Sequence, residues 1–358
     1  MTTKDLLSAI INASEKSANI ARVCRKNEEL FKLLIEEKSG SEKNERFLHD
    51  FKTLADVVIQ EMIRHDVGKL FPGLASGIKG EEGNKFENKL GESVTVEITD
   101  DPNDTKALLL KVLDGNEIAA EALTEEIHKV VSTAEAEKLP AIAASLPSNV
   151  GIWIDPIDGT AEYINGQNLS TDIPNVERSG LKCATVLIGA YNKDTSKPFM
   201  GVINQPFFQG TPEDGYTSKI FYGASIDGEN HHNIVDSPTD NSQKVAVISM
   251  AENRKTSLQC AGYRTIVSNG AGYKILKVIE NDASIYFLSK NSTFKWDTCA
   301  GQAILNSIGG DVIDLQASLM KKKPISLTYK EGEDKCNKNG LIAYRSVTHL
   351  INLIPSFL

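Results

Sequence analysis

Cysteine is scarce in this chain of 358 residues, and its placement excludes two kinds of site. The five cysteines are odd in number, widely scattered and without a Cys-x-x-Cys pair: Cys24, Cys183, Cys260, Cys299 and Cys336. Such spacing fits neither a disulfide framework nor a zinc site. We therefore expect a protein of a reducing compartment, with a cytoplasmic location.

Long apolar runs and an excess of basic charge are also missing. No uninterrupted apolar stretch is long enough to span a bilayer, and the first residues lack the layout of a secretory signal peptide. The formal net charge of −9 disfavours non-specific nucleic-acid binding, which requires a basic surface. We expect neither a membrane nor a nucleic acid as a partner.

The rest of the composition is that of an ordinary globular protein, with 41% apolar and 24% charged residues. The length suits about two domains. Helical periodicity predicts helices over residues 3–38, 53–65 and 105–129, with irregular chain at 70–89 and 132–148. The first part of the chain should therefore be rich in helix.

From residue 150 the pattern changes to that of strands. Apolar runs predict strands at 150–155, 183–190, 199–204 and 219–224. Residues 226–243 have almost no apolar side chains and are the best candidate for a linker. Beyond them, predicted strands alternate with helices, as in an α/β unit. The sequence thus predicts a mixed α/β fold, with an α+β domain over 1–240 and an α/β domain over 241–358.

The most informative segment is the decapeptide Gly151–Thr160, GIWIDPIDGT. Its apolar start predicts a short buried strand, which Pro156 and Gly159 should end in a sharp turn. Asp155 and Asp158 would then project from one loop. Two carboxylates held so close repel each other unless a cation neutralises them, and Mg²⁺ prefers oxygen ligands of this kind. The alternative is a plain Pro-Gly turn with aspartates at turn positions.

Three further acidic features accompany this decapeptide. Thr53 and Asp56 form a capping-box pattern ahead of an apolar helix, so Asp56 is either a cap or a functional carboxylate. Glu81 and Glu82 are either a solvated pair in a loop or metal ligands. Asp297 either caps the helix that follows it or binds a metal. The two tryptophans of the chain neighbour two of the acidic features, which suits a site with rigid, dry walls.

Taken in order, these motifs resemble the signature of a known family. Asp56, Glu81-Glu82, DPIDGT from Asp155 and Trp296-Asp297 are similar to the motifs of the lithium-sensitive, magnesium-dependent phosphomonoesterases of the inositol monophosphatase and fructose-1,6-bisphosphatase type. The resemblance covers nearly the whole chain and is strongest to the branch that acts on inositol polyphosphates. Segments that carry it include SEKSANIARVCR from Ser14, DFKTLAD from Asp50, GAGYK from Gly270 and TFKWDTC from Thr293.

The resemblance implies a fold and a set of cofactors. The fold would be a five-layered αβαβα sandwich with metal ions bound between its two domains. Two or three Mg²⁺ per active site and inhibition by Li⁺ are implied. The implied metal ligands are Glu81, Glu82, Asp155, the Ile157 carbonyl, Asp158, Asp297 and, beside them, Asp56. Asp155 would bridge two ions that clamp the attacking and leaving oxygens of an in-line displacement.

The resemblance also implies the reaction. A metal-activated water would hydrolyse the 1-phosphate of inositol 1,4-bisphosphate and inositol 1,3,4-trisphosphate without a phosphoenzyme. The implied catalytic residues are Asp56, Thr160 and Glu82. The implied substrate contacts, several of them in Gly-rich turns ahead of helices, are Asp158, Gly159, Thr160, Ser249, Gly270, Ala271 and Lys274. We expect the protein to be a monomer whose partner is a small-molecule inositol phosphate substrate.

Two other functions fit the same residues. A 3′(2′),5′-bisphosphate nucleotidase would share the metal site and the mechanism, and an adenine pocket in its second domain would replace contacts to the second phosphate of the inositol. A catalytically silent inositol-phosphate-binding protein is the other alternative. Because Asp56, Thr160 and every metal carboxylate are present, nothing in the sequence indicates a disabled site.

Overall fold

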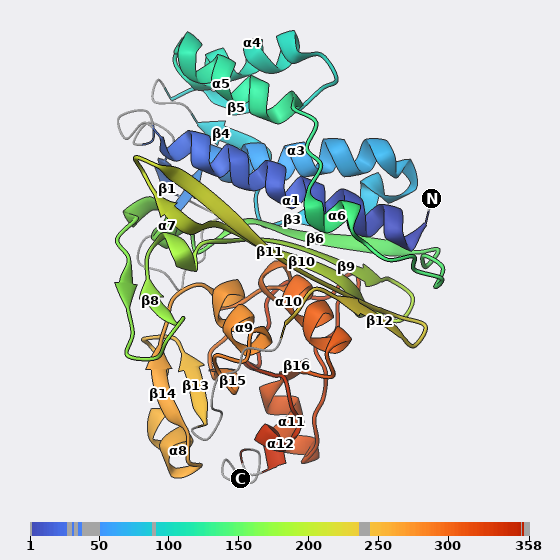
Figure 1. Ribbon diagram of the computed structural model, residues 1–358, viewed down its shortest axis with the longest axis vertical. Coiled ribbons are helices and arrows are strands. Elements are labelled where there is room, and N and C mark those ends of the chain that lie inside the picture. The colour runs from blue at the N-terminus through green and yellow to red at the C-terminus, as the bar shows by residue number, and fades with distance from the viewer. Residues whose placement is uncertain are drawn as a thin grey trace.

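The chain folds into five stacked layers of helix and sheet (Figure 1). The computed structural model describes residues 2–26, 31, 35–37, 51–87, 91–235, 244–351 and 353. The layers are helices α1 and α3, a six-stranded sheet, helices α9 and α10, a five-stranded sheet, and helices α8, α11 and α12. The predicted mixed α/β class and the αβαβα sandwich are confirmed.

The helices of these layers have clear ends. Their bounds are α1 Thr3–Arg25, α3 Leu54–Leu70, α8 Lys255–Cys260, α9 Ala271–Ile279, α10 Lys295–Ser307, α11 Leu315–Lys321 and α12 Thr348–Ile351. Thr2 and Thr53 cap α1 and α3, and each forms a capping box with the aspartate three residues later. These reciprocal bonds satisfy backbone N–H groups that a helix start otherwise leaves without partners.

The first sheet is mostly antiparallel and has the strand order β12-β11-β10-β9-β6-β3. Its strands are β3 Ile78–Gly80, β6 Val150–Asp158, β9 Thr185–Asn192, β10 Lys197–Thr211, β11 Gly215–Ile226 and β12 Glu229–His232. The pair β3 and β6 is parallel. This parallel pairing brings the ends of β3 and β6 to the same edge of the sheet, where the site lies.

The second sheet has the strand order β14-β13-β15-β17-β16. Its strands are β13 Val245–Ile248, β14 Arg264–Val267, β15 Ile285–Leu288, β16 Asp311–Asp314 and β17 Leu341–Tyr344. Strand β13 is parallel to both β14 and β15, whereas β17 is antiparallel to β15 and β16. The three parallel strands therefore present their C-terminal ends on one side.

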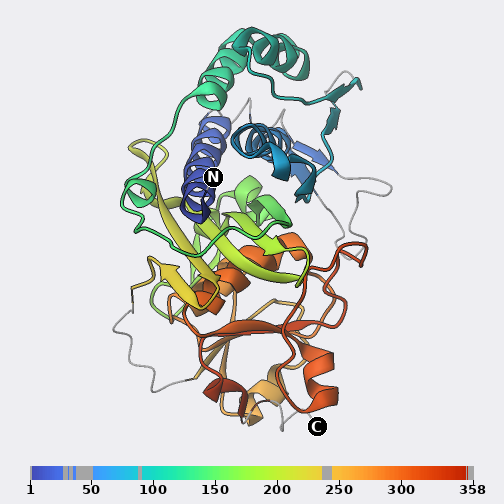
Figure 2. The ribbon, with the colours of Figure 1, turned by 90° about the vertical axis from the view of Figure 1, so that its right-hand side faces the viewer.

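Smaller elements decorate this sandwich. They are β1 Ile35–Glu37, β2 Phe51–Thr53, η2 Pro72–Gly77, β4 Lys85–Glu87, β5 Ser93–Thr95, α4 Pro102–Val112, α5 Glu117–His128, α6 Ala134–Glu137, α7 Thr160–Asn165, β7 Leu169–Ser170, β8 Glu177–Ser179 and η3 Leu181–Cys183. Helices α4 and α5 lie beyond α1 and α3, on the side away from the first sheet (Figure 2).

Alternation along the strands divides the core between the layers. On β9, Ile188 faces the core shared with α1 and α3, whereas Leu187 faces the core shared with α9 and α10. On β13, Val247 faces α9, and Ile248 faces the outer helices. Both patterns follow from the two-residue period of a strand. Each sheet is therefore covered by helices on both faces.

Three glycines allow α10 to lie against the first sheet. Gly189, Gly201 and Gly223 are paired across β9, β10 and β11, and a Cβ on any of them would come within 3 Å of α10 backbone atoms at Ala300 or Ile304. Without side chains at these positions, helix and sheet approach closely. The start of α10 is thereby held beside β6.

Several expected boundaries were wrong. The helix predicted over 3–38 ends at Arg25, and residues 35–37 pair with β2 as strand β1. The helix predicted over 105–129 is two helices, α4 and α5, separated by Gly115 at φ 82°. Part of the expected linker, residues 229–232, is β12 paired with β11. The division at residue 240 remains a prediction, since residues 236–243 lie outside the described part of the chain.

Candidate active site

Strand β6 carries two of the predicted aspartates, and a bulge aims both at the same face. The sequence predicted that the strand ends at Asp155, but it continues to Asp158. Asp155 lies opposite Leu187 and Asp158 opposite Thr185, so three steps along β6 match two along β9. In a regular strand, residues three apart point to opposite faces, and the extra residue cancels that difference. Pro156 lies within this irregularity, where its missing N–H costs no ladder bond.

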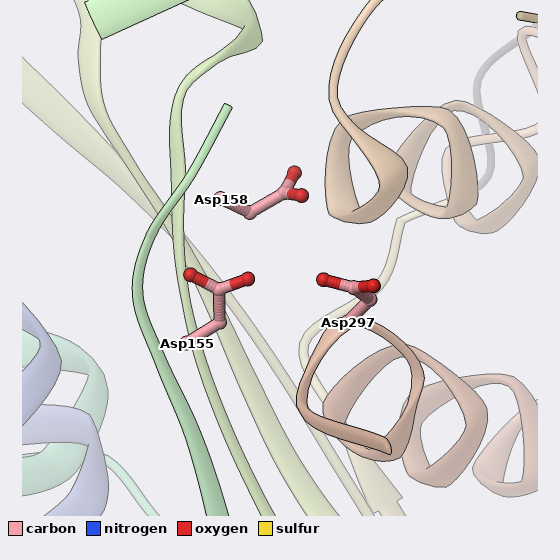
Figure 3. Close-up of side chains that lie close together, drawn as sticks. All are labelled: Asp155, Asp158 and Asp297. Carbon is pink, nitrogen blue, oxygen red and sulfur yellow. The ribbon is translucent and has the colours of Figure 1, made fainter. Parts of the chain in front are cut away.

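The third aspartate comes from the far end of the chain. Asp297 lies in the first turn of α10, and its Oδ2 accepts a hydrogen bond of 2.6 Å from the Phe294 N–H. Carboxylate oxygens of Asp155, Asp158 and Asp297 lie within 4.8 Å of one another, and all three residues are buried. Figure 3 shows the three carboxyl groups converging, two from β6 and one from the start of α10. Asp297 thus both helps to cap α10 and belongs to the aspartate triad.

The electrostatics of this triad are unfavourable without a cation. Burial, then Glu81 and the two other aspartates, raises the pKa of Asp155 well above its usual value. Burial, then Asp158 and Glu81, does the same to the pKa of Asp297. The Oδ1 atom of Asp155 is buried and has no hydrogen-bond partner. A buried, all-oxygen donor set with an unpartnered carboxylate oxygen fits a hard divalent cation.

Strand β3 places the glutamate pair beside the triad. The prediction of irregular chain at 70–89 missed this strand, which pairs Gly80 with Ile154, and the Glu81 N–H donates to the Ile154 carbonyl over 3.1 Å. Because β3 and β6 are parallel, Glu81, which follows Gly80, lies beside Asp155, which follows Ile154. Glu81 is half-buried and Glu82 is 6% exposed, so the pair is not a solvated loop.

Gln60 on α3 fixes the same loop and was not anticipated from the sequence. Its Nε2 donates to the Glu82 carbonyl over 2.7 Å, and its Oε1 accepts from the Glu82 N–H over 3.0 Å. A Cβ at Gly80 would lie 1.8 Å from the Gln60 Oε1, so only glycine leaves room for this amide. The available signal in the sequence was a glutamine among the apolar residues of a helix, because an amide buried there requires hydrogen-bond partners.

Asp56 lies where its capping pattern predicts. Its Oδ2 accepts hydrogen bonds from the Thr53 N–H over 2.6 Å and from the Thr53 hydroxyl over 2.7 Å. Asp56 is 1% exposed and does not line the cavity described below. The structure thus describes Asp56 as the partner of the N-cap Thr53 in the capping box of α3, and its catalytic role stays a prediction.

Helix α7 begins directly after β6. Gly159 has φ 83°, and a Cβ there would lie 3.2 Å from the Cys183 carbonyl. The Thr160 hydroxyl donates to the Ile157 carbonyl over 3.1 Å. Glu162 accepts hydrogen bonds of 2.6 Å from the Gly180 N–H and from the Asn269 amide. These contacts fasten the turn that carries Gly159 and Thr160.

The start of α9 faces Asp158. The N–H groups of Ala271 and Gly272 donate to the Asp158 carboxylate over 3.1 and 2.9 Å, an arrangement that the positive end of a helix favours. Gly270 has φ 73°, and a Cβ there would lie 2.6 Å from the Cys183 carbonyl. Ala271 thus holds a predicted metal ligand, a function that the sequence did not reveal.

Lys274 lies one turn into α9 and is almost completely buried. Its Nζ donates to the Ser268 carbonyl over 3.2 Å and lies 5.1 Å from the centroid of the Tyr286 ring. Burial lowers the pKa of Lys274 to about 8, although Asp158 acts in the opposite direction. The ammonium group is therefore close to its titration point at neutral to mildly alkaline pH.

One cavity of about 1200 Å³ joins these features. Every predicted site residue except Asp56 lines it: Glu81, Glu82, Asp155, Ile157, Asp158, Gly159, Thr160, Ser249, Gly270, Ala271, Lys274 and Asp297. Its basic lining residues are Arg64, Lys79, Lys274, Lys290 and Lys335. These cations locally offset the negative net charge of the chain. Most of these cations follow no motif, so the sequence did not single them out.

The two tryptophans pack beneath the site. Their ring centroids are 6.0 Å apart, and Trp296 also stacks on Phe294 at 4.6 Å. Cys299 lies in the same apolar cluster with no exposed surface, and burial raises the pKa of its thiol well above the usual value. Cys299 is thus a packing residue, and the aromatic cluster gives the triad a rigid wall.

Solved structures of other proteins share this fold. The chain superposes on extragenic suppressor protein suhB from Bartonella henselae with a TM-score of 0.53 and on an IMPase from Thermotoga maritima with a TM-score of 0.52. Sequence identities are 14% and 15%, each match covers 98% of this chain, and the matches cover 98% and 96% of those chains. At such low identity the likeness concerns the fold.

The sequence comparisons define the family. Residues 6–348 match the inositol monophosphatase family, and the chain belongs to this family. Among its relatives, the inositol polyphosphate 1-phosphatases of Mus musculus and Homo sapiens are 41% and 39% identical to it. These matches cover 97% and 96% of this chain, and 95% and 94% of the relatives. The 3'(2'),5'-bisphosphate nucleotidase 1 of Homo sapiens is 27% identical over 69% of this chain and 75% of that protein.

Proposed function

We propose that this protein is an inositol polyphosphate 1-phosphatase, which removes the 1-phosphate from inositol 1,4-bisphosphate and inositol 1,3,4-trisphosphate. The observation that carries the proposal is the buried triad of Asp155, Asp158 and Asp297 in a chain about 40% identical, over nearly its whole length, to inositol polyphosphate 1-phosphatases. The identity to the bisphosphate nucleotidase is lower and covers less of the chain, so the inositol substrate is favoured.

The acidic residues fit Mg²⁺ as the cofactor. Glu81, Asp155 and the Ile157 carbonyl would hold one ion, and Asp155, Asp158 and Asp297 a second. A third, more loosely bound ion would be held by Glu81, Glu82 or water. When bound, Mg²⁺ neutralises the carboxylates and polarises phosphate and water oxygens. The support lies in the orphaned Oδ1 of Asp155 and in the mutual repulsion of the buried aspartates.

The other site residues would bind the phosphate and position the water. Lys274 supplies a buried cation beside Asp158, and the open backbone at Gly159 and Gly270 allows a phosphate to approach closely. Because the Thr160 hydroxyl hydrogen is directed to the Ile157 carbonyl, its oxygen is free to accept a hydrogen bond from water. Asp56 and Glu82 would take part in removing the proton of that water.

Phosphate release from four substrates in parallel tests the function. The substrates are inositol 1,4-bisphosphate, inositol 1,3,4-trisphosphate, adenosine 3′,5′-bisphosphate and inositol 1-phosphate, each with Mg²⁺ and with a chelator. We expect chelator-sensitive turnover of the first two. Preferred turnover of the nucleotide would overturn the substrate assignment, and the absence of release from all four would indicate a silent binding protein.

Three finer properties belong to the same proposal. Inhibition by Li⁺ is expected from the resemblance to the lithium-sensitive family. A cytoplasmic location agrees with the scattered cysteines, which are free where the structure describes them. A monomer is expected from the sequence. Within the described residues, no helix combines the length and apolar character needed to cross a membrane.

A further inference from the structure

We propose that Lys290 is a specificity-determining residue, which binds the phosphate that is not cleaved. The inference rests on the proposed function, because it assumes a substrate with two phosphates. It concerns a lysine that belongs to none of the sequence motifs and lies on the wall of the cavity formed by the second sheet. The triad would hold the metal ions at the scissile phosphate, and Lys290 would bind the other phosphate.

The placement of Lys290 follows from the parallel strands of the second sheet. It is the second residue after β15, and Tyr286 and Leu288 on β15 also line the cavity. Strands β13 and β15 are parallel neighbours, so the residues that follow them meet at one edge. Ligands bind preferentially at this edge of parallel strands. Lys290 therefore lines the same cavity as Ser249, which follows β13 and was predicted to contact substrate.

A buried glutamate holds these two strand ends together. Glu252, which is 4% exposed, accepts a hydrogen bond of 2.8 Å from the Ser289 N–H and one of 2.6 Å from the Ser289 hydroxyl. It also accepts from the Arg254 N–H over 2.8 Å. The backbone immediately before Lys290 is thereby fixed to the loop after β13. A side chain on so constrained a backbone loses less entropy when it binds an anion.

Lys290 also differs in charge environment from the other basic residues of the cavity. Arg64 is paired with Glu61 at 2.7 Å, and Lys79 is paired with Glu331 at 3.1 Å. Lys335 lies 5.7 Å from the Trp296 ring centroid. Within the described residues, Lys290 is half-buried and forms no hydrogen bond or ion pair. A lysine kept at a cavity wall without a counter-charge is ready to receive an anionic group of the ligand.

The chemistry of a bisphosphate requires such a group. A second phosphate carries its own negative charge into a cavity whose carboxylates would repel it. The cavity, at about 1200 Å³, has room for an inositol ring between the triad and the edge of the second sheet. Lys290 would neutralise the distal phosphate there. It would contribute to binding rather than to bond cleavage, because the distal phosphate does not react.

Steady-state kinetics of Lys290→Met tests the inference on the intact enzyme with Mg²⁺. We expect KM for inositol 1,4-bisphosphate to rise about tenfold, the loss of one charge-assisted contact, with kcat within about twofold of wild type. The inhibition constant of inositol 4-phosphate, which keeps only the distal phosphate, should rise by the same factor. Inhibition by inositol 1-phosphate, which lacks that phosphate, should be unchanged relative to wild type.

Lys290→Arg and Lys335→Met are the matched controls. Lys290→Arg retains the charge and should recover most of the affinity, whereas Lys335→Met removes a cation from the same cavity and should leave KM unchanged. An unchanged KM in Lys290→Met, with an active wild-type enzyme, would overturn the inference alone. A wild-type enzyme inactive on inositol 1,4-bisphosphate would overturn the proposed function, and the inference with it.

Discussion

At the scale of single residues, the aspartates of the triad lower the stability of the protein but allow it to bind cations. Asp155 is the clearest case, because its buried Oδ1 has no partner, and burial together with three acidic neighbours raises its pKa. Buried like charges destabilise a folded protein unless protons or metal ions neutralise them. The aspartates that the function requires therefore destabilise the fold when no cation is bound.

Replacing Asp155 by Asn should separate stability from activity. A carboxyl group whose pKa is raised in the folded state stabilises that state at low pH, and this contribution is lost as pH rises towards the raised value. In chelator, wild-type Tm should therefore fall as pH rises above the ordinary carboxyl pKa of about 4, and the fall should be smaller in Asp155→Asn. Activity with Mg²⁺ should drop by about 100-fold or more. Calorimetry and phosphate release check both, and an equal pH dependence of Tm in the two proteins would contradict the account.

Lys274 should set an alkaline limit on substrate binding. Its pKa of about 8 means that the side chain is charged below that pH and neutral above it. KM for the inositol phosphate should rise above pH 8 and approach a tenfold rise per pH unit. Lys274→Arg stays charged throughout, so its KM, though higher at pH 7, should not rise between pH 8 and 9. A rise of the same size in the variant would assign the titration to another group.

At the scale of elements, the ligands are positioned by contacts between segments that are distant in sequence. Gln60 on α3 holds the backbone of Glu82 after β3, and the start of α9 holds Asp158 after β6. Such supporting contacts are often as important as the ligands themselves. They belong to residues without a recognisable motif.

Gln60→Leu should raise the Mg²⁺ concentration needed for half-maximal activity by about 10-fold or more. The cause is the release of the Glu81-Glu82 loop, and the unpaired Glu82 backbone groups should also cost about 1–3 kcal/mol of stability. Gln205→Leu is the matched control, because that buried amide contacts the Lys182 carbonyl rather than a predicted metal ligand. Metal titrations well below Tm distinguish the two variants. Similar Mg²⁺ requirements in both would show that Gln60 has no positioning role.

Gly201→Ala tests the close approach of α10 to the first sheet. The new Cβ would lie 2.2 Å from the Ala300 carbonyl oxygen, which is backbone and cannot rotate away. We expect a loss of about 1–3 kcal/mol or more from overpacking, together with lower activity because Asp297 moves with α10. Gly73→Ala, where nothing lies within 4 Å, should be close to neutral. Denaturant unfolding measures both, and equal stabilities would contradict the packing argument.

At the scale of the whole molecule, the two sheets share one helix layer. Leu187 and Ile203 from the first sheet lie in the same core as Ile275 and Ile304 from α9 and α10. Helices α9 and α10 belong to the second half, so the first half does not cover the inner face of its own sheet, and the triad draws ligands from both halves. Folding of the first half should therefore depend on the second.

A fragment of residues 1–240 should not fold by itself. Without α9 and α10, the inner face of the first sheet is left exposed, and exposed apolar sheet faces aggregate. We expect the fragment to lack a cooperative thermal transition, whereas the whole chain unfolds in a single one. Circular dichroism and calorimetry provide the measurement. A cooperative, soluble fragment would support independent domains divided at residue 240.

Much of this molecule was predictable because its signals are local. The strands from 183 to 224 were located from apolar runs, and the capping of α3 from Thr53 and Asp56. The short strands β1 and β12 were missed because their sequences are polar and only pairing with a neighbour makes them strands. The bulge after Asp155 was missed for the same reason, since it exists only relative to β9.

The sequence by itself determined the chemistry. It supplied the carboxylates of the DPIDGT pattern and the glycine-rich turns, and it identified the family. Only the tertiary structure decided which groups surround that chemistry. Gln60, Lys290 and the N–H groups of α9 reach the site through packing of helices and strand ends far apart in the chain. The physical reason is that residue type is a local property, whereas burial, the pKa of a carboxyl group and a missing counter-charge depend on neighbours that only the fold brings together.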